Sequence, residues 1–285
     1  MSDILTRTPP PADHRIPYGP GESQFGDLRL PTLAPNQRAP VLVFLHGGWW
    51  KSAYGLDYAG HLCAALKADR FASWSLEYRR VGNPGGGFPG TFEDVANGFD
   101  HLKTLAKTYP LDLNRVVVAG HSAGGHLAFW LAGRHHLPET GPLANFRIAA
   151  PIRGVVALAG AVDLKLTIDL AGWFTFAHDK QMVLDLMGAT PAQAPDRYLA
   201  ANPGGLIPLN VPQFLLQGTE DDQIPPQLPA RWADRARRIG DAVTVDIISG
   251  ADHFDIVDPQ SKAWPRVRKA ILQAATWTLS SKIVR

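Results

Sequence analysis

Short apolar runs alternate with amphipathic stretches over most of the chain. The runs are rich in Val, Ile, Leu and Phe, and Gly, Pro or polar residues bound them. Strands that are buried on both faces need such nearly continuous apolar runs. The runs that we predict as strands are residues 41–45, 71–77, 116–119, 155–158, 213–217 and 243–248. Because helical patterns separate them, the chain predicts an α/β fold with a mostly parallel central sheet and helices on both faces.

Amphipathic stretches between these runs predict the helices. Apolar residues recur at helical spacing from Val95 to Ala106, and Thr91 and Asp94 at the start of this stretch have the spacing of a capping box. Two later helices are indicated by apolar positions on one side: Leu228, Trp232 and Ile239 in the first, and Val267, Ile271, Ala274 and Ala275 in the second.

Two regions depart from this alternation. Residues 1–38 are rich in Pro and turn formers, so we expect an irregular or partly stranded lead-in and a regular fold that begins at Pro40. Residues 163–208 mix aromatic residues with several Pro and Gly, and we expect a small helical cap inserted between two strands. Ligands of open parallel sheets bind at the carboxyl ends of the strands, so this cap would roof the substrate pocket. The alternative is that its apolar residues only fill its own core. We expect residues 1–285 to form one domain.

Composition narrows the possible partners. The 285 residues are 45% apolar, and 28 basic against 26 acidic side chains give a net charge of +2. That balance does not create the strong positive field of a nucleic-acid-binding protein. No apolar run reaches the length of a membrane span, and the Pro-rich start lacks the apolar region of a signal peptide. We therefore expect a soluble, cytoplasmic protein without nucleic-acid or membrane partners; a homodimer stays open.

Three other features carry no chemistry in this interpretation. Residues 85–87 are a Gly triplet with no Lys-Ser or Lys-Thr after it, which indicates a flexible loop and not a phosphate site. His135, His136 and Glu139 lack the H-E-x-x-H spacing of a zinc site. The single cysteine, Cys63, lies in a helical pattern and is expected to be a small buried apolar residue. We expect neither a metal nor a cofactor.

The strongest chemical signal is a G-x-S-x-G motif at residues 120–124, with Ser122 at its centre. An apolar strand precedes it and a helix-forming segment follows it at once, which is typical of a nucleophile elbow. The glycines allow the sharp reversal that lifts the serine hydroxyl out of the sheet edge. His121 and His126 flank the serine in sequence, but we expect the turn and the helix to direct them away from its oxygen.

A serine hydroxyl needs an imidazole to take its proton and a carboxylate to orient that imidazole. His253 follows the last predicted strand and a turn, on the loop where such a base belongs. Carboxylates stand in the turn after residues 213–217, and we assign Asp221 as the orienting acid. Asp222 is expected to cap the turn or the next helix, and Glu220 is the other candidate acid.

Acyl transfer also needs donors for the developing oxyanion. The strand 41–45 ends in a Gly-rich loop, His46-Gly-Gly-Trp-Trp50, at the position that such donors occupy. We assign the oxyanion hole to the backbone amides of Gly48, Trp49 and Ala123. His46 is expected to brace the loop by hydrogen bonds rather than to act as a base.

Together these motifs resemble the α/β-hydrolase superfamily, in the branch that carries an HGG loop. That branch includes hormone-sensitive-lipase-like esterases and kynurenine formamidases (arylformamidases). Residues 46–50 are similar to the formamidase HGGYW motif, with Trp49 in place of Tyr, and residues 120–125 and 252–256 are similar to its serine and histidine surroundings. The lipase-like esterases have HGGG and an Asp before the serine, where this chain has Trp49 and His121. The order of serine, acid and histidine also matches the superfamily.

The resemblance implies a serine hydrolase that forms an acyl-enzyme on a small ester or an activated aryl amide, such as an N-formyl aryl amide. Trp49 and Trp50 would narrow the acyl side of the pocket, and Trp173 and Phe174 of the cap would face an aromatic leaving group. Two alternatives remain. One is a general short-chain carboxylesterase or lactonase, and the other is a non-catalytic small-molecule binding protein on the same fold.

Overall fold

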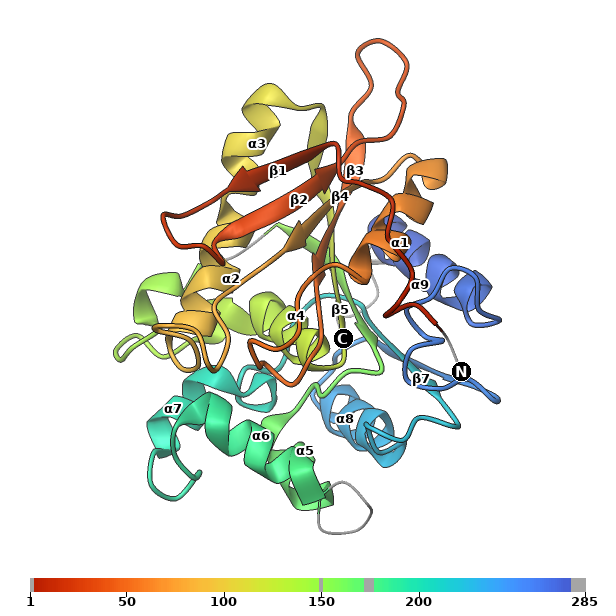
Figure 1. The fold of residues 1–285 in the computed structure, drawn as a ribbon. Helices are drawn as coiled ribbons and strands as arrows, with labels where there is room; N and C mark the ends of the chain where they lie inside the picture. The colour runs from red at the N-terminus through yellow and green to blue at the C-terminus, as the bar shows by residue number, and fades with distance from the viewer. Residues whose placement is uncertain (1–2, 149–150, 172–176, 278–285) are drawn as a thin grey trace, which may run out of the picture.

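The computed structural model describes residues 3–148, 151–171 and 177–277 (Figure 1). In that part of the chain, eight strands form one sheet in the order β1-β2-β4-β3-β5-β6-β7-β8. The strands are β1 (His14–Pro17), β2 (Phe25–Arg29), β3 (Ala39–Leu45), β4 (Ala72–Leu76), β5 (Leu111–His121), β6 (Ile152–Leu158), β7 (Gln213–Gly218) and β8 (Val243–Ile248). Strands β3 to β8 run parallel, whereas β2 pairs antiparallel with both β1 and β4. The predicted parallel strands and the α/β fold class are therefore confirmed.

Helices cover both faces of this sheet (Figure 1). The α-helices are α1 (Ala59–Ala65), α2 (Gly90–Asp100), α3 (Leu102–Thr108), α4 (Ala123–Gly133), α5 (Leu164–Leu170), α6 (Ala177–Met187), α7 (Pro195–Ala201), α8 (Gln227–Arg238) and α9 (Trp264–Thr276). Short 3-10 helices are η1 (Leu66–Asp69), η2 (Arg134–His136), η3 (Ala144–Phe146) and η4 (Pro203–Gly205). Alternate side chains of β3 enter opposite layers: Val43 joins the core with α2, α4 and α8, whereas Leu42 joins the core with α1 and α9. Period-two alternation in a strand buried on both sides gives this three-layer arrangement.

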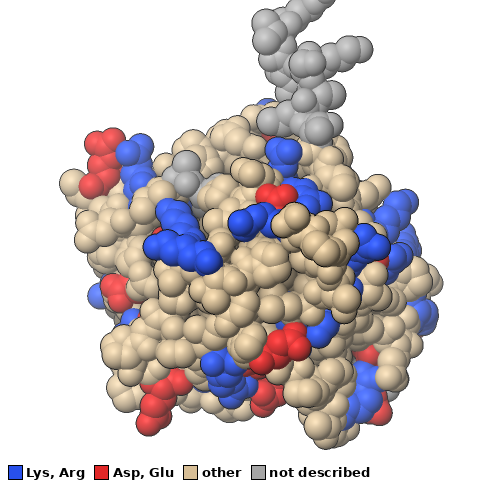
Figure 2. All heavy atoms as spheres, turned by 90° about the horizontal axis from the view of Figure 1, so that it is seen from above, with Lys and Arg blue, Asp and Glu red and all other residues tan. Residues whose placement is uncertain are grey.

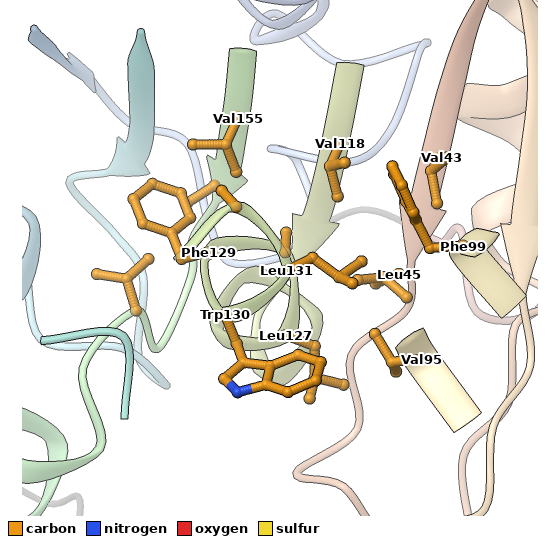
Figure 3. Packing of buried hydrophobic residues seen from close by; sticks show 14 of the residues in the cluster. Val43, Leu45, Val95, Phe99, Val118, Leu127, Phe129, Trp130, Leu131 and Val155 are labelled. Atoms are coloured by element: carbon orange, nitrogen blue, oxygen red, sulfur yellow. The ribbon is translucent and has the colours of Figure 1, made fainter. Parts of the chain in front are cut away.

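Helix α4, which follows the serine turn, lies entirely inside the molecule. Every residue from Ala123 to Gly133 is buried. Figure 3 shows its Leu127, Trp130 and Leu131 packed between strand side chains such as Val118 and those of α2. Full burial of a large apolar side chain contributes about 1.5–3 kcal/mol. The helix that begins one residue after Ser122 is therefore fixed by a dense core.

The lead-in is partly stranded, as one of the two expectations had it, but the expectation that the regular fold begins at Pro40 is wrong. Strands β1 and β2 precede it and extend the sheet at its antiparallel end. Their apolar signal is weak because β2 buries two charged residues, Asp27 and Arg29. Arg15 of β1 pairs with Asp27 at 2.7 Å, so a cross-strand ion pair replaces the apolar contacts that a sequence pattern would show.

Two details of the predicted helices also change. The helix expected from Val95 to Ala106 is divided into α2 and α3 at His101. Thr91 and Asp94 do not form a capping box, because the Thr91 hydroxyl donates to the Arg79 carbonyl oxygen at 2.6 Å and Asp94 accepts from the Arg79 guanidinium at 2.7 Å. Leu228 and Trp232 are buried on α8 as expected, but Ile239 lies after the helix end and is exposed.

Residues 163–208 form α5, α6, α7 and η4 between β6 and β7, as a helical insertion was predicted to do. The Asp163 carboxylate caps α5 by accepting the amides of Lys165 and Leu166 at 2.9 and 3.1 Å. The buried apolar residues of this insertion belong to the same core as α4: Leu164, Leu170, Val183, Leu186, Met187 and Tyr198. These apolar residues therefore do not fill a separate core of the cap, which was the stated alternative, but pack against the body of the protein.

The surface shown in Figure 2 carries basic and acidic side chains interspersed with uncharged area. This distribution agrees with the nearly balanced composition. None of the helices in the described part of the chain combines the length and the hydropathy needed to cross a bilayer.

Candidate active site

Ser122 occupies the sharp turn between β5 and α4. Its φ of 54° and ψ of −122° lie outside the regions that L-residues usually adopt, and it is 2% exposed. Such strain persists only where the surroundings enforce it. A Cβ at Gly120 would stand 2.0 Å from the Gly124 carbonyl oxygen, and one at Gly124 would stand 2.0 Å from the Leu45 carbonyl oxygen. Both glycines of the motif are thus required by close backbone packing.

His253 and Asp221 form a buried pair on the loops after β8 and β7. His253 Nδ1 lies 2.8 Å from Asp221 Oδ2, and this carboxylate also accepts the Gln217 side-chain amide at 2.8 Å. Its other oxygen accepts the amides of Gln223 and Ile224 at 2.9 and 2.8 Å. Burial by itself raises the pKa of Asp221, but the charge of His253 and these hydrogen bonds outweigh it, so the pKa lies below its usual value. Asp221 is therefore ionised and fixed in orientation.

The neighbouring carboxylates, Asp222 and Glu220, are not buried as Asp221 is. Asp222 was expected to cap the turn, but it is exposed, and Asp221 itself accepts the amides of this turn. Glu220, the other candidate acid, is also exposed. One side chain thus combines the capping and the orienting interactions that the sequence had divided between two residues.

Ser122 and His253 line one cavity of about 490 Å³ at the carboxyl ends of the parallel strands. The loop residues Gly48 and Trp49 line it as well. The rest of its wall includes apolar, aromatic and polar side chains from distant segments: Leu5, Tyr54, Asp57, Tyr58, His121, Gln223 and Phe254. The structure therefore brings the predicted serine, base and donor loop to one open pocket.

The three amides predicted as oxyanion donors remain available. Among the described residues, no hydrogen bond engages the backbone N–H groups of Gly48, Trp49 or Ala123. Gly48 and Trp49 have φ values of 109° and 52°, so this loop is held in a conformation that ordinary residues avoid. Ala123 is the first residue of α4, where the helix dipole adds positive potential.

His46 braces this loop from behind, as predicted. It is fully buried, its Nδ1 lies 2.7 Å from the Gly47 carbonyl oxygen, and its Nε2 lies 2.9 Å from Glu77 Oε1. The ring stacks on Tyr78 with a centroid distance of 4.5 Å. Burial raises the pKa of Glu77, but His46 and Arg80 outweigh it and hold that pKa below its usual value. Glu77 is thus a charged anchor for the loop.

Tyr58 and His121 are residues of the site that the sequence did not identify. The Tyr58 hydroxyl lies 2.6 Å from the Gly47 amide nitrogen and 2.8 Å from His121 Nδ1, and His121 Nε2 lies 3.0 Å from the His253 carbonyl oxygen. Both side chains are buried. Burial, with the nearby His253, lowers the pKa of His121 to about 3. His121 is therefore neutral, and its ring points at the backbone of the base rather than acting as one.

Of the predicted pocket side chains, Trp49 lines the cavity, whereas the others lie elsewhere or outside the described residues. Trp50 is fully buried and packs edge-on against His126 with a centroid distance of 5.3 Å, so it belongs to the core and does not line the cavity. Trp173 and Phe174 lie outside the described residues. Among those that are described, no residue of 163–208 lines the cavity. The described wall comes instead from the N-terminal segment and from the loops after β3, β5, β7 and β8.

This arrangement suits one kind of chemistry. An alcohol on a strained turn shares a pocket with an imidazole that a carboxylate orients, and free backbone donors stand beside them. These are the parts that nucleophilic acyl transfer needs. The described residues hold no group of three or more His, Cys, Asp or Glu side chains that could bind a metal ion.

Comparison with known proteins gives a family match over most of the chain. The BD-FAE family model matches residues 27–233, which include Ser122 and Asp221 but end before His253. The esterase LipQ of Mycobacterium tuberculosis is 27% identical over 254 residues, which cover 85% of this chain and 57% of LipQ. A probable isoprenylcysteine alpha-carbonyl methylesterase of Arabidopsis thaliana is 24% identical and covers 85% of this chain and 50% of that protein. The chain thus spans little more than half the length of these curated relatives.

Solved structures share the fold. Esterase B from Lactobacillus rhamnosis, in a complex with an inhibitor, superposes with a TM-score of 0.77 at 18% identity and covers 95% of this chain and 89% of that one. A truncated carbohydrate esterase from gut microbiota superposes with a TM-score of 0.76 at 18% identity and covers 95% and 100% of the two chains. At such identities the likeness concerns the fold alone.

Proposed function

The chain belongs to the BD-FAE family of α/β-hydrolases, and from this premise we propose that it is a serine carboxylesterase that works through an acyl-enzyme. The observation that carries the proposal is the shared pocket. Ser122 and His253 line the same cavity, and Asp221 holds the far nitrogen of that imidazole at 2.8 Å. Asp221 also stabilises its own turn, but the combination of serine, imidazole and carboxylate at one pocket serves acyl transfer.

The proposed reaction has two halves. Ser122 Oγ attacks the carbonyl carbon while His253 Nε2 takes its proton, and the amides of Gly48, Trp49 and Ala123 bind the resulting oxyanion. When the intermediate collapses, His253 returns that proton to the leaving oxygen and the acyl group stays on Ser122. Water then attacks the acyl-enzyme with His253 as base, which releases the acid and restores the serine. Asp221 keeps the proton of His253 on Nδ1 throughout.

The pocket wall supports an ester with an apolar or aromatic part. Leu5, Trp49, Tyr54 and Phe254 line the cavity, and aromatic walls favour flat apolar groups. The names of LipQ and of the Arabidopsis methylesterase describe ester hydrolysis by those proteins. Hydrolysis of small carboxylic esters is thus the first candidate activity for this chain.

Cleavage of an N-formyl aryl amide is the second candidate. The same aromatic lining favours it, since an aryl amine could lie against Tyr54 or Phe254. The HGGWW loop adds its resemblance to the formamidase HGGYW motif.

A substrate panel tests both candidates. Wild type and Ser122→Ala are compared on p-nitrophenyl acetate, p-nitrophenyl hexanoate, 2-naphthyl acetate and N-formylkynurenine. We expect ester hydrolysis that Ser122→Ala loses. Amide cleavage with poor ester turnover would select the second candidate, and ester hydrolysis that survives in Ser122→Ala would overturn the serine mechanism.

A further inference from the structure

One chain of buried hydrogen bonds joins three segments that supply separate parts of the proposed chemistry. It runs from the Gly47 amide to the Tyr58 hydroxyl at 2.6 Å, on to His121 Nδ1 at 2.8 Å, and from His121 Nε2 to the His253 carbonyl oxygen at 3.0 Å. Gly47 belongs to the donor loop, His121 precedes the serine, and His253 is the base. The residues that the chain connects lie 11, 63 and 132 positions apart in sequence.

The direction of every hydrogen bond in this chain is fixed by its ends. The Gly47 N–H can only donate, and the His253 carbonyl can only accept. With His121 neutral, its one proton must therefore be on Nε2, facing that carbonyl. Nδ1 is then an acceptor, so the Tyr58 hydroxyl donates to His121 and accepts from Gly47. The lowered pKa of His121 agrees with this neutral state.

The donor loop depends on this chain of hydrogen bonds, because there is almost no free space around Gly47. A Cβ at Gly47 would stand 2.8 Å from Ser122 Cβ and 3.1 Å from the Tyr58 hydroxyl. The Gly47 carbonyl oxygen is held from the other side by His46 Nδ1 at 2.7 Å. The backbone of Gly47 is thus held at both its N–H and its C=O, immediately before the donors of Gly48 and Trp49. Donors fixed in this way need no rearrangement when an oxyanion forms.

We infer that Tyr58 and His121 are positioning residues, which hold the oxyanion donors and the backbone of His253 in a fixed relation to Ser122. The inference rests on the proposed function and adds two residues to it. Neither side chain takes or gives a proton in the reaction. Both act through the residues that they hold: Tyr58 through Gly47, and His121 through His253.

The test compares two tyrosines whose hydroxyls form hydrogen bonds at different places in the fold. Tyr58→Phe removes the central hydroxyl of the hydrogen-bond chain, and Tyr198→Phe removes a hydroxyl on α7 that donates to the Ala189 carbonyl at 2.8 Å. With p-nitrophenyl acetate we expect kcat of Tyr58→Phe to fall by about 10-fold to 100-fold, because displaced oxyanion donors cost rate. Its KM should stay within about twofold of wild type. Tyr198→Phe should keep kcat within about twofold, because the hydrogen bond that it loses does not reach the pocket.

His121 gives the second arm and covers the case in which Tyr58→Phe does not fold. His121→Leu removes both contacts, whereas His121→Gln keeps a donor near the position of Nε2. We expect Leu to lower kcat as much as Tyr58→Phe does and Gln to restore part of the loss. If Tyr58 and His121 act through the same chain of hydrogen bonds, the fold reduction of kcat in the double variant Tyr58→Phe/His121→Leu should be much smaller than the product of the two single reductions.

Each outcome decides the matter. A fall in kcat confined to Tyr58 and His121 variants, with non-multiplicative coupling, supports the inference. Wild-type kcat in Tyr58→Phe, an equal loss in Tyr198→Phe, or a change in KM alone overturns it. Ser122→Ala separates this result from the proposed function: if that variant is inactive while the Tyr58 variant is normal, only the positioning role is wrong.

Discussion

Two cavities lie at opposite edges of the same sheet, and only one of them contains reactive groups. The cavity at the carboxyl ends of the parallel strands measures about 490 Å³ and includes Ser122 and His253. The cavity at the amino ends of β3, β4 and β5 is larger, at about 600 Å³, and includes Arg38, Arg70 and Arg115. Size would therefore select the wrong pocket, whereas chemistry selects the smaller one.

The polar groups of the two cavities differ in their hydrogen-bond and ion-pair partners. At the amino-end cavity, the guanidinium of Arg38 donates to the Leu111 carbonyl and Arg115 pairs with Asp112 at 2.7 Å. Those interactions tie down strand ends. At the carboxyl-end cavity, backbone amides stay free, and a buried carboxylate orients an imidazole whose second nitrogen has no partner among the described residues. Parallel strands bring their following loops together at that edge, so loop residues from distant positions can converge there.

The largest expected effect is the loss of Ser122. Ser122→Ala should lower kcat for p-nitrophenyl acetate by about 10⁴-fold or more, because no other group in the pocket can carry the acyl intermediate. Steady-state hydrolysis measures it, with Ser75→Ala, a buried serine on β4, as the control. If Ser122→Ala kept a tenth of the wild-type activity, the claim that the carboxyl-end cavity differs from the amino-end cavity by its reactive serine would be wrong.

Asp221→Asn should have the next largest effect. An amide cannot hold the proton of His253 on Nδ1, so we expect kcat to fall by about 10³-fold to 10⁴-fold with little change in KM. Asp222→Asn, on the adjacent exposed residue, should stay within about twofold. Similar losses in the two variants would contradict the assignment of Asp221 as the orienting acid.

Acid should destabilise the carboxyl-end region in particular. Burial lowers the pKa of His121 to about 3 and that of His126 to about 4, whereas both take the ordinary value of 6.5 in the unfolded chain. Below pH 6.5 the unfolded state therefore binds more protons, and the free energy of unfolding falls by about 1.4 kcal/mol per pH unit for each histidine until the folded pKa is reached. Denaturant unfolding between pH 7.5 and pH 5 should show this slope, and His121→Gln should make it shallower. An unchanged slope would mean that His121 is not buried as a neutral ring.

Leu5 should tune the choice of leaving group. Its neighbours anchor the segment beside the loop of His253, because Ile4 is fully buried and Arg7 pairs with Asp258 at 2.6 Å. His253 must protonate the leaving oxygen, so the leaving group lies on this side. Leu5→Ala should lower the kcat/KM ratio of 2-naphthyl acetate to methyl acetate by about fivefold, since part of an apolar contact is lost. Leu199→Ala, which is similarly exposed on α7, should leave the ratio unchanged.

The amino-end cavity gives the smallest expected effect. Arg70→Ala should change neither kcat nor KM by more than about twofold for any ester of the panel, because Arg70 is exposed and far along the strands from Ser122. If Arg70→Ala lost activity toward some esters and not others, the amino-end cavity would influence the carboxyl-end cavity. The two cavities would then not be independent.

The sequence could place the proposed serine, acid and base because each follows a recognisable strand. Ser122, Asp221 and His253 stand at or shortly after the ends of apolar runs, so their convergence at one edge follows from the parallel sheet. Tyr58 gave no such signal, since its partners lie 11 and 63 positions away and depend on tertiary packing. Trp50 misled for the opposite reason: it stands beside the donor loop in sequence, but its ring points into the core.

The fold shows the same division. The parallel strands were evident from their continuous apolar runs, whereas β1 and β2 were hidden because β2 buries two charged residues, Asp27 and Arg29. The helical content of the cap could be predicted from its composition, but its packing could not, because the same apolar residues fit either a pocket roof or a core.

The most direct test of the account is to trap the acyl-enzyme. The protein is mixed with p-nitrophenyl acetate, quenched in acid within the first turnovers, and digested for mass spectrometry. The account predicts one added acetyl group on the peptide that contains Ser122, and a larger acetylated fraction in Asp221→Asn if deacylation becomes the slower half. Turnover without an acetyl group on that peptide, or with the acetyl group on another residue, would contradict it.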